Sequence, residues 1–320
     1  MTTRIIHKAR APKARRAIVY AASKWEPYVY EGFLRALREA RKAFRTDEVV
    51  AALARNAPEI AVAAMPWAEL ERALERNLMV PIKNAVADGA AATVRDLTVT
   101  KRDDPKKKPK PRPTGFSIGA DVSFDLDNPR TQNYLARNAA TLVTRVRNET
   151  MLAIRHITTD AHARGLNVGQ QAEKIAAALR RDIGLNQKQA GALGRYEATL
   201  IESGVAQGQI DRQVNEYRDR LIDSRARTIA RHETMTGSNV GQQEVWTQAT
   251  KQGLLEPDQK RVWITQPGLN AENPCPICRP MSGQVRGLKE PFVSPYDGTT
   301  AMQPPAHISC MCVSSLYFED

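Results

Sequence analysis

The 320-residue chain has few aromatic residues, no long apolar run and only four cysteines, and each scarcity excludes a class of protein. Aromatic residues make up 6% of the chain, which disfavours a β-sandwich or barrel. No apolar run approaches the ~18 residues of a membrane span, and the basic N-terminus is not followed by a signal-peptide core. We therefore expect a soluble protein with no membrane partner. Its abundant alanine favours long helices.

Positive charge is concentrated in two stretches of the chain. The net charge is +12, and residues 1–45 carry twelve Lys and Arg against three Glu, while residues 101–113 carry seven against two Asp. Such clusters attract polyanions through phosphate neutralisation, without base specificity. We expect both stretches to contact DNA as flexible elements, although solvated tails that aid solubility are an equal alternative. The candidate nucleic-acid-binding residues are Lys106, Lys107, Lys108, Lys110 and Arg112.

Helical periodicity dominates the first 250 residues. Apolar residues recur at Phe33, Leu34, Leu37 and Phe44 among charged ones, which predicts an amphipathic helix. Thr46 is expected to cap a short second helix, and Pro66 suits the first turn of a third. Further helices are predicted over residues 129–164, 169–183, 186–203 and 210–251.

Two segments depart from this pattern. Residues 98–127 contain prolines among lysines and are predicted to form an extended linker, because nothing there can pack a core. Beyond Gly253, short apolar runs and prolines predict strands and turns. The expected fold class is mainly α, a long-helix bundle with a small irregular α+β Cys/His module at the C-terminal end. The expected domains are a basic N-terminal helical region (1–97), the linker (98–127), a helical body (128–252) and the module (253–320).

All four cysteines and one histidine fall in two tight clusters of the module. Cys275 and Cys278 form a CxxC pair, and His307, Cys310 and Cys312 follow after a gap of 28 residues. A CxxC turn lets two thiolates reach one tetrahedral ion, and a second pair of ligands completes the site, which makes zinc the natural candidate. A pair of disulfides and plain buried thiols are the alternatives, because five candidates do not fit four positions.

No other motif assembles a catalytic site. His232 and Glu233 lie on a helix, but a zinc protease needs a second histidine where Thr236 stands. The chain has no phosphate-binding loop and no nucleophile elbow. We therefore expect a protein that is not an enzyme.

The second half of the chain resembles a known family. The residues concerned are RDRLIDSRARTIARHETMTGSNVGQQEVW after Tyr217, then KRVWIT, CPICRPMSGQV, EPF and PPAHISCMC. Their identity and order are similar to the C-terminal domain of tailed-phage minor head proteins, the Mu F-like head morphogenesis family. The resemblance covers roughly residues 165–316, about half the chain. The chain departs from the family at His232, which is usually Thr, and at Met311, which is usually Arg.

The resemblance implies a structural virion component inside the phage head, made in the host cytoplasm and incorporated during procapsid assembly. Its implied partners are the portal protein, capsid or scaffold proteins and the packaged phage DNA, with a role in DNA packaging or ejection. We expect residues 128–250 to dock on the portal, because long amphipathic helices can expose apolar stripes. Alternatively, these stripes close on one another and the N-terminal helices dock.

Two other functional classes remain as alternatives. A zinc-knuckle nuclease would need a second catalytic histidine near the knuckle, and residues 256–320 contain only His307. The module also carries five basic against seven acidic residues, which disfavours DNA contact there. A zinc-knuckle DNA-binding protein acting as a regulator has no helix-turn-helix signal to support it.

Overall fold

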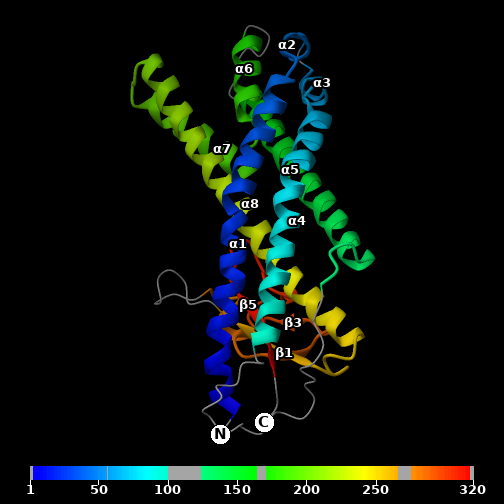
Figure 1. The fold of residues 1–320 in the computed structure, drawn as a ribbon. Coiled ribbons are helices and arrows are strands. Elements are labelled where there is room, and N and C mark those ends of the chain that lie inside the picture. The colour runs from blue at the N-terminus through cyan, green and yellow to red at the C-terminus, as the bar shows by residue number, and fades with distance from the viewer. Residues whose placement is uncertain (1–2, 56, 100–123, 164–170, 266–274, 318–320) are drawn as a thin grey trace, which may run out of the picture. The chain divides into compact units, whose positions relative to one another are not determined.

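The fold was analysed in a computed structural model, which describes residues 3–55, 57–99, 124–163, 171–265 and 275–317. Long helices dominate it, as Figure 1 shows, and the predicted mainly α fold class is confirmed. The helices are α1 (Thr3–Lys42), α2 (Thr46–Ala54), α3 (Pro58–Ala63), α4 (Trp67–Val99), α5 (Pro129–Ala163), α6 (Ala172–Asp182), α7 (Gln187–Glu202) and α8 (Gln207–Lys251).

The strands all belong to the C-terminal module, as predicted. They are β1 (Lys260–Ile264), β2 (Val285–Gly287), β3 (Phe292–Val293), β4 (Thr300–Ala301) and β5 (Val313–Tyr317), and a 3₁₀ turn, η1, spans Arg279–Met281. An antiparallel sheet has the order β2-β1-β5, with Trp263 of β1 paired to Ser314 of β5. A separate hairpin pairs β3 with β4.

The chain forms two compact units, each built from several separate segments of the sequence. Unit 1 comprises residues 1–29, 80–134 and 228–320, and unit 2 comprises residues 30–79 and 135–227. Each of α1, α4, α5 and α8 contributes one part to each unit. A long helix leaves no change of composition where it passes from one core to another, so sequence boundaries could not reveal this division.

In unit 2, the apolar stripe of α5 is buried. Leu135, Leu142, Val146 and Ile154 are each at most 4% exposed. The α5 stripe therefore belongs to the core of unit 2 and is not an exposed docking face. Docking of residues 128–250 on a partner stays a prediction.

The end of α6 is fixed by tight packing and charge pairing. Gly184 has a φ of +106°, and an added Cβ would come within 2.4 Å of Leu37 Cδ1, so only glycine fits there. Buried Arg218 donates a hydrogen bond to buried Asp182. Arg225 donates to Gly184 O and to Glu149 Oε2. Burial lowers the pKa of Arg225 to about 10 despite the nearby Glu149 carboxylate.

In unit 1, α4 and α8 approach until their backbones touch. A Cβ added to Gly241 would lie 2.0 Å from Val86 O, and one added to Gly89 would lie 2.2 Å from Ser238 O. Ser238 also donates to Ala85 O across the contact, at 3.2 Å. Glycines therefore set the spacing of the two helices.

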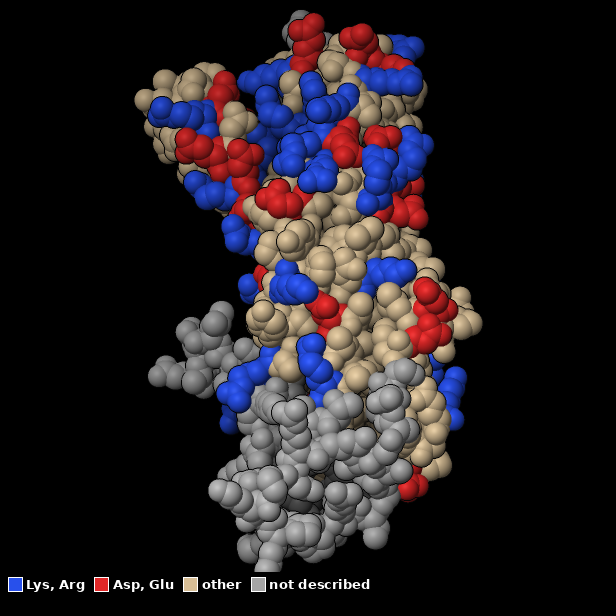
Figure 2. Space-filling model, viewed as in Figure 1, with Lys and Arg blue, Asp and Glu red and all other residues tan. Residues whose placement is uncertain are grey.

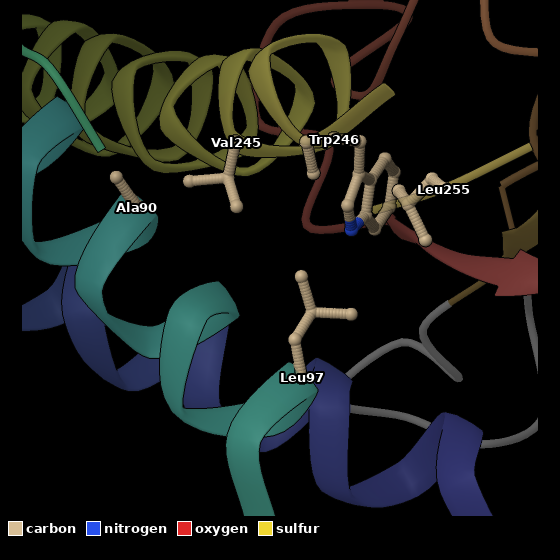
Figure 3. Close-up of a cluster of buried hydrophobic side chains, with 6 residues drawn as sticks. Ala90, Leu97, Val245, Trp246 and Leu255 are labelled. Carbon is tan, nitrogen blue, oxygen red and sulfur yellow. The ribbon is translucent and has the colours of Figure 1, made fainter. Parts of the chain in front are cut away.

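An apolar cluster continues this contact along the same two helices (Figure 3). Leu97 of α4 points toward Val245 of α8, and Trp246 lies beside Leu255. Trp246 is only 2% exposed. A buried Trp of this size contributes several kcal/mol, since Trp→Ala changes in cores cost about 3–5 kcal/mol. This cluster fixes the C-terminal end of α8, from which the module continues.

Several local predictions were wrong or incomplete. The first helix begins at Thr3 and not near residue 30, so the basic arm is helical over residues 3–42. Thr46 is the first residue of α2, whose preceding residue Arg45 makes no side-chain cap. The short helix α3 was not expected. The linker prediction falls almost entirely on residues 100–123, which lie outside the described residues.

No helix in the described part of the chain combines the length and apolar character that a membrane crossing requires.

Candidate metal centre

The module has its own small core behind the cysteines. Trp263 of β1 is 1% exposed and meets Phe292 of β3 edge to face, with ring centroids 5.1 Å apart. Met281, Cys278, Cys310 and Cys312 complete this buried cluster. Aromatic packing thus anchors one side of each cysteine segment.

The CxxC segment folds as a knuckle. Arg279 N donates to Cys275 O at 2.9 Å and Met281 N donates to Cys278 O at 3.1 Å, which wraps the backbone around the two thiols. The hydroxyl of Thr265 donates to Cys278 O at 2.9 Å and ties the knuckle to the strand end. Both thiol groups can therefore reach a common point, as the CxxC spacing predicts.

The second segment reverses direction between His307 and Cys310. Cys310 N donates to His307 O at 3.2 Å, which closes a turn. Ser309 inside this turn has a φ of 62°, a left-handed conformation that non-glycine residues seldom adopt. The turn brings the imidazole and the thiol of Cys310 toward the knuckle.

The two segments bring all five predicted ligands together. His307 Nε2 lies 3.0 Å from Cys275 Sγ and 3.0 Å from Cys278 Sγ, and Cys278 Sγ lies 3.6 Å from Cys310 Sγ. Two groups could hold a metal ion, Cys275/Cys278/His307 and Cys278/Cys310/Cys312, with the ligand atoms of each group within 4.8 Å of one another. Cys278 belongs to both groups.

The cysteines are unbridged, and their spacing is not that of a disulfide. All four are free, and 3.6 Å between Cys278 Sγ and Cys310 Sγ far exceeds an S–S bond of ~2.05 Å. The chemistry of the donors suits a thiolate-binding metal, because three of the cysteines are buried and the imidazole faces them.

Hydrogen bonds within the cluster shift the pKa values of its side chains. The bond from Cys278 lowers the pKa of the Cys310 thiol, and the same bond raises the pKa of Cys278. The hydrogen bond with Cys310 raises the pKa of His307 to about 9, against the opposing effect of burial. A metal must therefore displace protons from this cluster in order to bind.

An arginine that the sequence did not single out supports the module from within. Arg261 of β1 is 0% exposed, and its guanidinium lies over the Phe292 ring, 4.8 Å from the centroid. Its Nη1 donates to Gln243 Oε1 at 2.6 Å and its Nη2 donates to Glu290 O at 2.8 Å. Burial lowers the pKa of Arg261 to about 10.

Amide side chains of α8 form hydrogen bonds with the backbone of the surrounding segments. Gln243 donates to Leu288 O at 2.9 Å, and Gln248 exchanges two hydrogen bonds with the backbone of Asp125. Asn239 donates to Met235 O at 2.9 Å and to Cys312 O at 3.5 Å. Apolar periodicity predicted this helix but not these contacts, because amides share its buried face with the apolar residues.

The predicted nucleic-acid-binding residues cannot be placed. Lys106, Lys107, Lys108, Lys110 and Arg112 lie outside the described residues. Over α2, α3 and α6, Figure 2 shows basic and acidic side chains interspersed. Exposed basic side chains of unit 2 also form ion pairs, such as Arg45 with Glu48 and Arg76 with Glu39. The described side chains over α2, α3 and α6 are therefore of mixed charge in this view.

Comparisons with known proteins gave no match: no family model, no curated protein and no solved structure is similar to this chain at a significant level.

Proposed function

We propose that this protein is a structural minor head protein of a tailed phage, which acts in procapsid assembly and in DNA packaging or ejection. Its partners in this proposal are the portal protein, capsid or scaffold proteins and the packaged DNA. In the mature virion the protein would lie inside the head, and during assembly it would be in the host cytoplasm.

One observation carries the proposal: the separate motifs of the family resemblance form one core. Trp263 from KRVWIT, Phe292 from EPF and the cysteines of both clusters pack together. The helix that carries RARTIARHET continues into the buried amides that bond to this module. Motifs scattered over ninety residues thus specify a single unit, which is what a shared family domain requires.

The finer proposal for the module is a structural zinc ion. The knuckle and the turn supply soft donors in a segment with little apolar core of its own, so metal binding would offset the entropy of ordering it. Zinc bound by these residues supplies a fixed cross-link between two distant segments. In this proposal the protein catalyses no reaction.

A nuclease is the alternative function, and the described module does not favour it. Among the described residues, the two groups that could hold a metal contain one histidine, His307, and four cysteines, which together can fill every position of a tetrahedral ion. A catalytic metal needs an open position for water or substrate. A closed shell of protein ligands fits a structural ion better.

Purified procapsids and virions test the assignment to the head. Cross-linking and mass spectrometry should detect this protein inside the head, with cross-links to the portal protein. Its absence from both particles, while it is abundant in the infected cell, would refute the proposal. Deleting residues 1–97 and, separately, residues 253–320 would show which region is required for incorporation. Metal-dependent cleavage of duplex DNA by the purified protein, lost in His307→Ala, would support the nuclease instead.

A further inference from the structure

The five donors outnumber the four positions of a tetrahedral zinc ion, so one of them must have a different role. The outer group, Cys275/Cys278/His307, is partly exposed, while Cys278, Cys310 and Cys312 are buried. Cys278 is common to both groups and is therefore a ligand in every arrangement. The question is whether His307 or Cys312 completes the shell.

The hydrogen bonding of His307 prepares it as a ligand. Its Nδ1 lies 2.8 Å from Ile308 O, a carbonyl that can only accept, so Nδ1 carries the proton. The lone pair of neutral His307 is then on Nε2, the atom that lies 3.0 Å from both Cys275 Sγ and Cys278 Sγ. A zinc-bound histidine usually donates its other ring N–H to a carbonyl or carboxylate in this way.

Charge favours the same choice. Three thiolates and a neutral imidazole around Zn²⁺ leave a net charge of −1, whereas four thiolates leave −2. The inner part of the cluster is buried, with Cys310 and Cys312 each 3% exposed. Burying a second uncompensated charge costs free energy, so the set with one imidazole is favoured.

We propose that one zinc ion is bound by Cys275, Cys278, Cys310 and His307 Nε2, and that Cys312 lies beside these ligands without binding the metal. The Sγ atom of Cys312 lies within 4.8 Å of the Sγ atoms of Cys278 and Cys310, and Cys312 is only 3% exposed. Its role is to orient and stabilise the ligands, not to bind the metal. This inference rests on the structural zinc proposed above.

Three alanine variants of the full-length chain test the ligand set: Cys312→Ala, Cys310→Ala and His307→Ala. Zinc per chain and affinity are measured by competition with a chromophoric chelator under reducing conditions. Cys312→Ala should retain one zinc, with affinity lowered no more than about 10–100-fold, the usual cost of losing an outer partner. Cys310→Ala and His307→Ala should lose stoichiometric zinc. Loss of zinc in Cys312→Ala with retention in His307→Ala would overturn the inference.

A measurement on the unmodified protein covers the case in which the variants do not fold. In the zinc-loaded protein, the ¹⁵N resonances of His307 should show Nε2 bound to metal and Nδ1 protonated. A free Nε2 in zinc-loaded protein would contradict the ligand set alone. Wild-type protein that takes up no zinc would refute the structural zinc as well, and neither result bears on incorporation into the phage head.

Discussion

Arg41 and Arg180 each donate a hydrogen bond to the C-terminal end of the helix that carries the other. Arg41 Nη2 reaches Arg181 O at 2.9 Å and Ile183 O at 3.0 Å, at the end of α6, and Arg180 Nε reaches Arg41 O at 2.9 Å, near the end of α1. The last carbonyls of a helix lack partners within it, and its C-terminal end favours positive charge. The two arginines therefore cap each other's helices.

Replacing Arg41 with Lys should destabilise unit 2 by about 1–2 kcal/mol, because an ammonium on a flexible stem reproduces the bridge to two carbonyls poorly. Arg38→Lys is the matched control, since Arg38 lies on the same helix and is exposed. Urea denaturation should separate the two variants. Equal stability of both would mean that the bridge contributes nothing.

Gly241→Ala should destabilise unit 1 by about 1–3 kcal/mol, the usual cost of overpacking, or more, because the new Cβ would lie 2.0 Å from Val86 O and force α4 and α8 apart. Gly208→Ala lies on the same helix and meets nothing within 4 Å, so it should be neutral or stabilise by up to about 1 kcal/mol. Thermal unfolding of both variants checks the pair, and a neutral Gly241→Ala would disprove the close contact.

Replacing Ser309 with glycine should lower the stability of the module less than replacing it with valine. The left-handed φ of 62° costs an ordinary residue about 1–2 kcal/mol, which glycine avoids, while a β-branched side chain adds strain. We expect Ser309→Gly to keep the stability and zinc affinity of the wild type and Ser309→Val to lower both. Ser282→Val is the control, because Ser282 is exposed with an extended backbone at φ −60°. An equal effect of valine at both positions would contradict this account.

Ionised Asp223 should make a small contribution to the stability of unit 2, and this contribution should be lost in acid. Hydrogen bonds from Arg227 and Tyr30 lower the pKa of Asp223, so its contribution is full above the ordinary carboxyl pKa of about 3.9 and is lost as the pH falls through the lower folded value. Asp223→Asn should therefore cost less than about 1 kcal/mol at pH 7, since the pair is exposed, and nothing in strong acid.

Urea titrations from pH 7 down to pH 3 measure this difference. Glu216→Gln provides the control on the same helix, because Glu216 is exposed. A gap between Asp223→Asn and wild type that stays constant across this range would show that ionisation of Asp223 is not responsible.

Removing metal should destabilise the C-terminal module more than the rest of the chain. Chelation under reducing conditions would leave the knuckle and the turn without their cross-link, and the thiols would regain their protons. Hydrogen exchange should then show faster opening of residues 275–317 and little change in unit 2. Unchanged exchange in protein shown to contain zinc beforehand would mean that the ion does not stabilise the module.

The sequence predicted most of the helices and the convergence of the cysteines with His307, because both leave a local pattern. Asn186 and Gln189 form a capping box at the predicted start of α7, and the CxxC and HxxCxC spacings fix which donors can converge. No local pattern predicts the reciprocal bonds of Arg41 and Arg180 or the buried pairing of Arg261 with Gln243. These contacts join separate segments of the chain, and the sequence around one partner does not predict the other.

The amides of α8 are synthesised before the segments of the module to which they bind. The ribosome completes α8 before it synthesises the module, so the backbone groups of Leu288 and Cys312, to which Gln243 and Asn239 donate, emerge after the helix. During translation, the helix is therefore available as a template before the strands that close on it exist. A fragment that begins after α8 would lack these donors, so expression of residues 253–320 alone should yield a chain that is captured by chaperones or degraded.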